Sequence, residues 1–495
     1  MRTSLSREEY GLLPPWRPYI ERLRPHVERV RYRSRYFNAV SAEVEVRKIS
    51  TICSFPFVKR LDLVGTYRRG VDPGPGRRDE PASSVQGGTV QSDRYGGSYT
   101  QLNQIEATRL LDLGYNGSGS NKGLEPVLVC VMDTGFDLTH EAFSHLSVVA
   151  QRDFIQGDSV TSNEPGDAAN QDKHGTTVLG TIAGYHEGDL IGPAWGADYL
   201  LAKTEFMNPP DVRIEEDYWV AGIEWADSCG ADIVTSSLGY IDWYTWEDLD
   251  GNKPLCTRAA DRAVSRGIIV VNSAGNQRDS LIAPADGDSV IAVGAVDRYG
   301  YITFFSSRGP TFDGRIKPEL VAMGMEVRSV LKGTTDGYSS YAGTSFSAPL
   351  VAGLCAQILE IHPEWSPVEM RQALLFTASR SGNPDNTYGY GLPRGMAASG
   401  FDFEEIFFCD GIPNPFSEQM SFQFYFPTPR PVTMRIYDCR GALVRTLDDN
   451  SLKDRMWTVT WDGTNDEGRQ VVSGVYFLDF ISSGFRKTYK LVRIR

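Results

Sequence analysis

Short apolar runs separated by longer mixed segments dominate the middle of the chain. The runs occupy 127–132, 199–202, 233–234, 267–271 and 290–293. Each run is continuous rather than alternating, which is typical of strands that are buried on both faces. Such strands with helical segments between them predict an α/β fold with a doubly wound, mostly parallel sheet. We therefore expect residues 99–400 to form one α/β domain.

Polar residues follow three of these runs at the point where each run ends. Asp133 follows the first run, Ser237-Leu238-Gly239 follows the third, and Asn276 follows the fourth. The carboxyl ends of parallel strands meet at one edge of such a sheet, and ligands bind outside that edge. The sequence therefore predicts a functional edge that carries these residues.

The pattern before the α/β domain is different. Residues 36–44 and 56–64 are strand-like, and residues 46–54 are compatible with a short helix. We expect residues 16–68 to form a small α+β domain. Residues 69–98 are rich in Gly, Pro, Ser, Asp and Arg, which predicts a linker and an easy site of proteolytic cleavage.

Beyond Phe401 the pattern changes to short alternating strands. Strand-like runs occupy 432–437, 442–445, 457–461 and 474–478. This pattern predicts a β-sandwich over residues 410–495. Cys409, directly before this range, and Cys439 within it could form a disulfide. The seven cysteines show no CxxC or Cys/His spacing of the kind that binds metals.

Length and charge narrow the function classes. A chain of 495 residues is too long for one core, so about three domains are expected. No apolar run approaches the ~18 to 20 residues of a membrane span. The net charge is +9 over residues 1–78, −21 over 79–400 and −1 over 401–495. A basic leader and an acidic body would attract each other, although a solvated acidic surface explains the same charges. The body has no basic stripe, which argues against nucleic acid as a partner.

Three short segments supply an acid, a base and a hydroxyl nucleophile. They are Asp133-Thr134-Gly135, His174-Gly175-Thr176 and Gly343-Thr344-Ser345-Phe346-Ser347-Ala348-Pro349. A serine hydrolase needs these three side chains, and Asp, His, Ser is one of the orders in which they occur. Ser345 precedes an apolar helical stretch with Pro349 in its expected first turn, so the serine would lie at a helix N-terminus. Asp137 and Asp172 are rival acids.

Together, the three segments resemble the active-site motifs of the subtilisin-like serine proteases, or subtilases. The resemblance implies that Asp133, His174 and Ser345 form a catalytic triad. It also implies that Asn276 donates a hydrogen bond to the oxyanion of the intermediate.

The same resemblance implies that Ser237, Leu238 and Gly239 bind an extended polypeptide substrate as an added strand. The family usually continues with Gly, whereas Tyr240 follows here. Its bulky side chain could narrow the pocket for the residue before the cleaved bond, so we predict no specificity.

Residues 16–68 resemble the propeptide domain of subtilases, through Asn38-Ala39-Val40-Ser41 and Pro56-Phe57-Val58. This implies a zymogen that is inhibited by its own propeptide until the chain cuts itself within 69–98. An unrelated small α+β module is the alternative.

The C-terminal segment resembles the Ig-like domains of some secreted bacterial enzymes, at Pro413-Asn414-Pro415-Phe416, Trp461-Asp462-Gly463 and Lys490-Leu491-Val492. Cell-surface or secretion machinery is then an implied partner. A structural appendage that only stabilises the enzyme is the alternative.

The resemblance implies chemistry that requires no cofactor. A structural calcium ion is compatible with the acidic body. However, Ala142 stands where many subtilases have a calcium-binding Asp, and the loop 185–189 departs from the usual calcium loop. That particular calcium site is therefore not expected.

We expect a secreted or cell-surface serine endopeptidase, although residues 1–10 lack the apolar core of a signal peptide. The first alternative is a catalytically inactive surface binding or adhesion protein on the same fold. An esterase of the α/β-hydrolase type ranks lower, because no G-x-S-x-G surrounds any serine.

Overall fold

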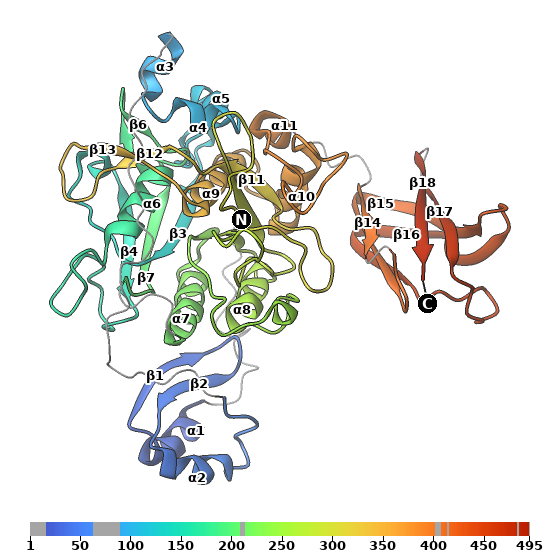
Figure 1. Ribbon diagram of the computed structural model, residues 1–495, viewed down its shortest axis with the longest axis horizontal. Helices are drawn as coiled ribbons and strands as arrows, with labels where there is room; N and C mark the ends of the chain where they lie inside the picture. Colours follow the sequence, from blue (N-terminus) through green and yellow to red (C-terminus); the bar gives the residue numbers. More distant parts are fainter. Residues whose placement is uncertain are drawn as a thin grey trace. The chain divides into compact units, whose positions relative to one another are not determined.

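The computed structural model describes residues 16–62, 90–207, 213–400, 407–412, 415–482 and 485–494 (Figure 1). The chain divides into two units, Met1–Phe312 with Ile316–Ser399 and Asp313–Arg315 with Gly400–Arg495. Most of the expected linker, together with residues 63–68 of the expected propeptide, lies outside the described residues. The described part of the expected linker, residues 90–98, begins with the helix α3 (Val90–Tyr95).

A seven-stranded parallel sheet forms the centre of the first unit, in the order β11-β10-β9-β8-β3-β7-β4. This confirms the expected α/β fold. The strands are β3 (Leu128–Asp133), β4 (Ser147–Asp153), β7 (Asp198–Lys203), β8 (Ile233–Ser236), β9 (Ile269–Ser273), β10 (Ile291–Val296) and β11 (Leu320–Met323). Five of them coincide with the apolar runs of the sequence.

Alternate residues of each strand enter two different cores. On β3, Val129 and Val131 face a core that includes α6 (Lys173–Ala183) and α9 (Thr344–Ile361). Cys130 and Met132 face a core under α7 (Ile214–Cys229) and α8 (Leu255–Val264). Both faces of the sheet are covered, which explains why the strands are apolar throughout.

Shorter elements complete this unit. They are α4 (Tyr99–Asn103), α5 (Ala107–Asp112), β5 (Tyr185–His186), β6 (Leu190–Ile191), β12 (Val327–Val330), β13 (Tyr338–Tyr341), α10 (Pro367–Thr377) and α11 (Gly395–Ser399).

Helix α9 is the central buried helix. Among the described residues it is the one helix long and apolar enough to cross a membrane, but 89% of it is buried inside the protein. It begins at Thr344, so Pro349 lies in its second turn. The sequence had suggested the first turn. Because Pro349 has no N–H, the carbonyl of Ser345 lacks its usual helical donor. The Ser237 hydroxyl donates to that carbonyl instead, at 2.8 Å.

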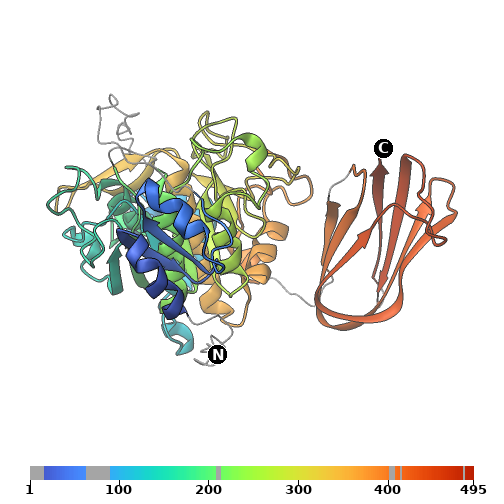
Figure 2. The same cartoon turned by 90° about the horizontal axis from the view of Figure 1, so that it is seen from below.

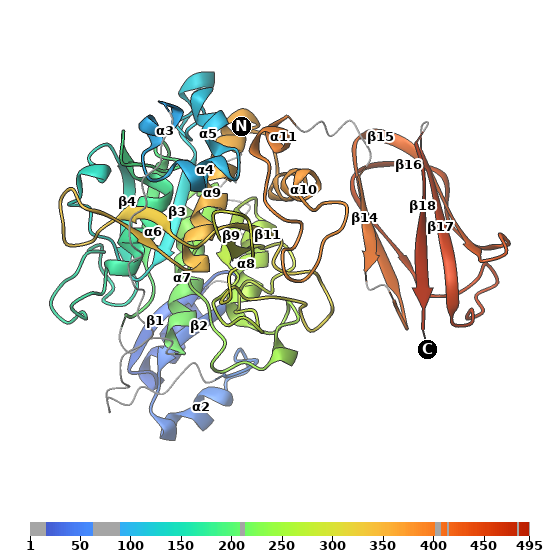
Figure 3. The same cartoon turned by 45° about the horizontal axis from the view of Figure 1, so that its top comes forward.

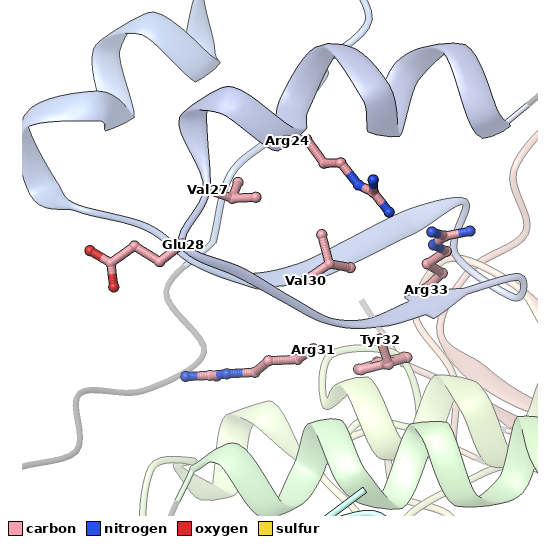
Figure 4. Close-up of a pocket in the computed structure, with 7 residues that line it drawn as sticks. All are labelled: Arg24, Val27, Glu28, Val30, Arg31, Tyr32 and Arg33. Carbon is pink, nitrogen blue, oxygen red and sulfur yellow. The ribbon is translucent and has the colours of Figure 1, made fainter.

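The N-terminal segment contains α1 (Trp16–Leu23), α2 (Ile49–Cys53) and an antiparallel hairpin of β1 (Arg29–Ser34) and β2 (Ala39–Glu43). The hairpin lies against α7, as Figures 1 and 3 show, and Figure 2 gives the view from below. Val27, Val30 and Tyr32 are among the residues that line a pocket at the hairpin. In Figure 4, Tyr32 points towards the helices of the α/β domain and Val30 points to the opposite side of the hairpin. This pocket belongs to the N-terminal segment alone.

The expected strand at 56–64 is wrong over its described part. Residues 56–62 form no strand, because the chain turns here, with Val58 N donating to Phe55 O at 2.9 Å. The rings of Phe55 and Phe57 stack on each other, and Tyr19 packs against Phe57. Phe55 and Phe57 therefore pack towards α1 instead of lying in a strand that pairs with β2. The strand that pairs with β2 is β1.

The C-terminal unit is an antiparallel β domain of β14 (Phe407–Ile412), β15 (Met420–Asp438), β16 (Leu443–Trp461), β17 (Gly474–Ser482) and β18 (Phe485–Arg493). It has its own core, which contains Trp461 and Phe422. The suggested disulfide is not formed, because Cys439 is a free thiol. Cys409 pairs in register with Gln423, near the start of β15, whereas Cys439 follows its end. At about 3.3 Å per residue the two lie far apart.

Candidate active site

Asp133 ends β3 and is fully buried. Its Oδ1 accepts a hydrogen bond from His174 Nδ1 at 2.7 Å and one from Thr134 N at 2.8 Å. A carboxylate can only accept here, so the hydrogen sits on Nδ1 and the lone pair of the imidazole is on Nε2. The carboxylate therefore sets both the orientation and the tautomer of the histidine.

The glycines beside Asp133 and His174 allow this close approach. A β-carbon on Gly175 would lie 2.2 Å from the carbonyl oxygen of Gly135. Gly135 has φ of 140°, which side chains disfavour. Both motifs thus need glycine for steric reasons, because the start of α6 packs directly on the loop after β3.

Ser345 lies in the first turn of α9 and is 8% exposed. The ring of its neighbour Phe346 lies 6.2 Å from the imidazole of His174, centroid to centroid. The first backbone N–H groups of a helix have no acceptor within the helix, and the dipole there favours negative charge. The first turn of α9, which carries Ser345, therefore lies near the histidine through Phe346, and its free backbone N–H groups are suited to a developing anion.

Asn276 follows β9 and contacts the start of the same helix. Its Oδ1 accepts from the Thr344 backbone N and from Thr344 Oγ1, both at 3.0 Å. These two bonds hold the amide group, and its Nδ2 points towards Gly343, 3.6 Å from where a β-carbon would be. The side chain therefore has an amide donor beside Gly343, at the start of α9.

The segment after β8 reaches Ser345 from the other side, through the bond from Ser237 described above. Tyr240 is not at the surface. Its ring is fully buried and stacked on Trp243, and its hydroxyl donates to the Glu215 carbonyl at 3.1 Å. The structure thus directs this bulky side chain into the core under α7.

The two rival acids have other partners. Asp137 Oδ1 accepts from Thr139 N and Oγ1, at 3.0 and 2.7 Å. Asp172 lies 2.8 Å from Lys332 and accepts from Asn163 N. Asp133 is the acid that contacts His174.

One group of carboxylates has the arrangement of a metal site. Oxygens of Asp153, Asp158 and Glu164 lie within 4.8 Å of one another. However, Lys203 Nζ lies 2.7 Å from Asp153 and 2.7 Å from Asp167, and it is not exposed. A buried ammonium group thus already supplies positive charge to this cluster. In the loop 185–189, Glu187 and Asp189 lie 3.5 and 3.7 Å from arginines.

Two acidic residues of α7 were not singled out from the sequence. Glu224 accepts from the backbone N of Arg35 at 2.7 Å and of Tyr36 at 3.3 Å, and Asp217 accepts from the Ser41 hydroxyl. The spacing of seven residues places both on one face of the helix, which is the only signal the sequence offered. They connect the N-terminal hairpin to the α/β domain.

The comparisons with known proteins agree with this geometry. The model of the Subtilase family matches residues 125–391, more than half of the chain. The chain belongs to the subtilase family. It is a serine peptidase of that family, as the sequence predicted. The model of the FlgD Ig-like domain matches residues 414–480.

Individual relatives show how far the likeness extends. Subtilisin E of Bacillus subtilis (strain 168) is 34% identical over 323 residues, which are 63% of this subtilase and 74% of the relative. Subtilisin of Bacillus pumilus is 34% identical over 318 residues, 63% and 100% of the two chains. The MycP3 protease from the type VII (ESX-3) secretion system has a TM-score of 0.51 at 20% identity over 66% of this chain and 93% of that one. That last likeness concerns the fold alone.

Proposed function

We propose that this subtilase is a serine endopeptidase in which Asp133, His174 and Ser345 form the catalytic triad. The observation that carries the proposal is the bond of 2.7 Å between His174 Nδ1 and Asp133 Oδ1. It prepares Nε2 as a base beside the first turn of α9. Chemistry of this kind needs no metal or other cofactor.

The reaction follows from these positions. Nε2 of His174 takes the proton of the Ser345 hydroxyl while Oγ attacks the peptide carbonyl. The resulting imidazolium gives its proton to the leaving amine, and an acyl group stays on Oγ. Water then attacks the acyl group with His174 again as base, which releases the acid and restores the serine. Asp133 stabilises the imidazolium in both stages.

The negative oxygen of each tetrahedral intermediate needs donors. Asn276 Nδ2 and the backbone N–H of Ser345 are the groups that we assign to it. The two bonds from Thr344 to Asn276 Oδ1 support this assignment, because they occupy the amide oxygen and fix the orientation of the side chain, with Nδ2 as its donor group.

A labelling experiment tests the nucleophile. A fluorophosphonate should modify Ser345 in the wild-type protein, and the Ser345→Ala variant should neither be labelled nor hydrolyse peptides. Ser347→Ala is the matched control, because Ser347 is a buried neighbour whose hydroxyl donates to the Thr344 carbonyl at 2.9 Å. Absence of labelling in a folded wild-type protein would contradict the proposal and favour an inactive binding protein.

We further propose that the protein is made as a zymogen and that residues 16–68 are its propeptide. The hydrogen bonds of the β1–β2 hairpin to Glu224 and Asp217 on α7 support this, as does the charge of +9 on residues 1–78 against −21 on 79–400. Cleavage within 69–98 would cut the covalent link between the hairpin and the catalytic domain. The intact mass of purified wild type should lack the leader or show it as a separate chain, whereas Ser345→Ala should stay uncut. Equal processing of both proteins would contradict self-cleavage.

Polypeptides are the expected substrates. A structural calcium ion stays a prediction, for which the carboxylates of Asp153, Asp158 and Glu164 would have to compete with Lys203. Secretion or attachment to a cell surface through the Ig-like domain also stays a prediction, supported by the match of residues 414–480.

A further inference from the structure

Two glycine-containing segments lie next to Ser345, and one side chain lies between them. The first segment is Ser237-Leu238-Gly239, which bonds to the Ser345 carbonyl, and the second is Gly275-Asn276, which bonds to Thr344. A β-carbon on Gly239 would lie 2.5 Å from Cδ1 of Ile282, and one on Gly275 would lie 2.9 Å from its Cγ2. Ile282 therefore packs against both glycines.

The backbone around Ile282 holds it in this position. Ala283 exchanges two hydrogen bonds with Tyr240, at 2.8 and 3.0 Å, and Ile282 N donates to the Ala274 carbonyl at 3.3 Å. Leu281 and Ala283 face the core under α7, with Leu238 and Tyr240. Because side chains alternate along extended chain, Ile282 and Gly239 face the opposite side. The isoleucine is 9% exposed, so protein atoms surround most of its side chain.

The space between Ser237-Leu238-Gly239 and Gly275-Asn276 is where a bound substrate would place the side chain before the cleaved bond. A peptide that pairs with Ser237–Gly239 and presents its carbonyl to Ser345 and Asn276 extends the side chain before the cleaved bond between the two segments. Two facing glycines would leave a slot there for a large side chain. In this protein the branched side chain of Ile282 closes the slot.

We infer that Ile282 is the specificity-determining residue of this peptidase and restricts the residue before the cleaved bond to glycine or alanine. The inference rests on the proposed function, because it requires cleavage at Ser345. A hydrogen or a methyl group fits beside Ile282, whereas a leucine or phenylalanine side chain would have to displace it. The side chain of Tyr240, the candidate from the sequence, lies in the core under α7 and not in this space.

A substrate series tests the inference. Tetrapeptide p-nitroanilides that differ only in the last residue (Gly, Ala, Leu or Phe) are hydrolysed by the full-length protein, and kcat/KM is compared within each variant. Wild type should prefer Ala over Phe by about 100-fold, which is the discrimination that steric exclusion in an apolar pocket gives. Ile282→Gly should reduce this preference at least tenfold, and Ile282→Ala should lie between the two. The ratio of two substrates does not depend on the fraction of active protein, so partial misfolding of a variant does not affect it.

Leu281→Ala is the matched control, because the neighbouring side chain faces the core, and its Ala/Phe ratio should equal that of wild type. The inference is overturned if wild type cleaves after Phe as readily as after Ala, or if Ile282→Gly leaves the ratio unchanged. If no variant cleaves any peptide and no fluorophosphonate is bound, the proposed function fails and the inference fails with it. The two failures are therefore distinguishable.

Discussion

The carboxylate of Glu224 accepts a hydrogen bond from the backbone N of Arg35 at 2.7 Å. A residue of the catalytic domain thus satisfies a backbone donor of the hairpin turn, and the same carboxylate accepts from Ser34 and Tyr36. The contact of the hairpin with α7 combines these carboxylate bonds with the packing of Tyr32, Tyr36 and Phe37 against the core under the helix. The stability of the contact between the hairpin and α7 should therefore depend on single carboxylates and on pH.

The first prediction concerns Glu224. Glu224→Ala removes the acceptor of three donors, of which the Ser34 hydroxyl is buried, and a buried donor left without a partner costs about 1–3 kcal/mol. If the hairpin belongs to an inhibitory propeptide, the variant should shorten the lag before peptidase activity appears by about tenfold or more. Glu224→Gln keeps an acceptor oxygen and should give an intermediate lag. Equal lags in all three proteins would show that this contact does not hold the propeptide.

Asp217 predicts how the same contact depends on pH. Burial raises its pKa from 3.8 to about 6, although the hydrogen bond from Ser41 acts in the opposite direction. When the hairpin leaves α7, water reaches Asp217 and its pKa falls back towards 3.8, so the docked state binds more protons than the undocked state between these pH values. Docking therefore weakens as the pH rises from about 4 to about 6. Above pH 6 the loss is complete and the hairpin should open more readily than at pH 5.

Hydrogen exchange on the uncut Ser345→Ala protein measures this opening. Amide protection in β1 and β2, corrected for the intrinsic rate, should be higher at pH 5 than at pH 7. Asp217→Asn has no charge to bury and should reduce the difference. A pH dependence that is unchanged in the Asn variant would assign it to other groups.

Asn276 should act on turnover more than on binding. Asn276→Ala removes the side-chain donor and should lower kcat by about 10²- to 10³-fold with little change in KM. That magnitude is the one known for the corresponding donor of subtilisin, a member of this family. Asn276→Asp is the informative companion, because it keeps an acceptor for Thr344 but has no donor. An Asp variant with wild-type kcat would show that the amide does not stabilise the oxyanion.

Local sequence patterns were sufficient to predict where Asp133 and His174 lie in the fold. The apolar run 127–132 forms β3, and Asp133 stands at its carboxyl end because the strand stops there. His174 lies in the first turn of α6, whose small residues pack on the sheet. Both placements depend on neighbours within a few residues, which is the range that periodicity covers.

Long-range pairings could not be predicted in this way. The strand β1 has Arg29, Arg31 and Arg33 at every second position. Such a charged segment did not stand out as a strand that pairs with β2. Ile282 lies more than 40 residues from Gly239, and only the folded chain shows that the two are in contact. The start of α9 was misplaced for a related reason, because the donor that compensates for Pro349 comes from Ser237 in another segment.

The last prediction concerns the ammonium group of Lys203 among the carboxylates of Asp153, Asp167 and Glu164. Burial opposes the charged form of the lysine, but the hydrogen bonds to Asp153 and Asp167 outweigh it and raise the pKa of Lys203. The lysine is thus an internal cation. Lys203→Met leaves buried carboxylates without a counter-charge and should destabilise the fold by about 3–5 kcal/mol.

Calcium should restore part of that loss, because carboxylate oxygens are the ligands that Ca²⁺ takes. Millimolar calcium should therefore raise the melting temperature of Lys203→Met by several degrees more than that of wild type, in which the ion has to displace the lysine. Lys253→Met removes a largely exposed lysine that pairs with Asp248, and it should behave like wild type. An equal calcium response in all three proteins would mean that calcium acts elsewhere and that Lys203 does not hold the place of a metal ion.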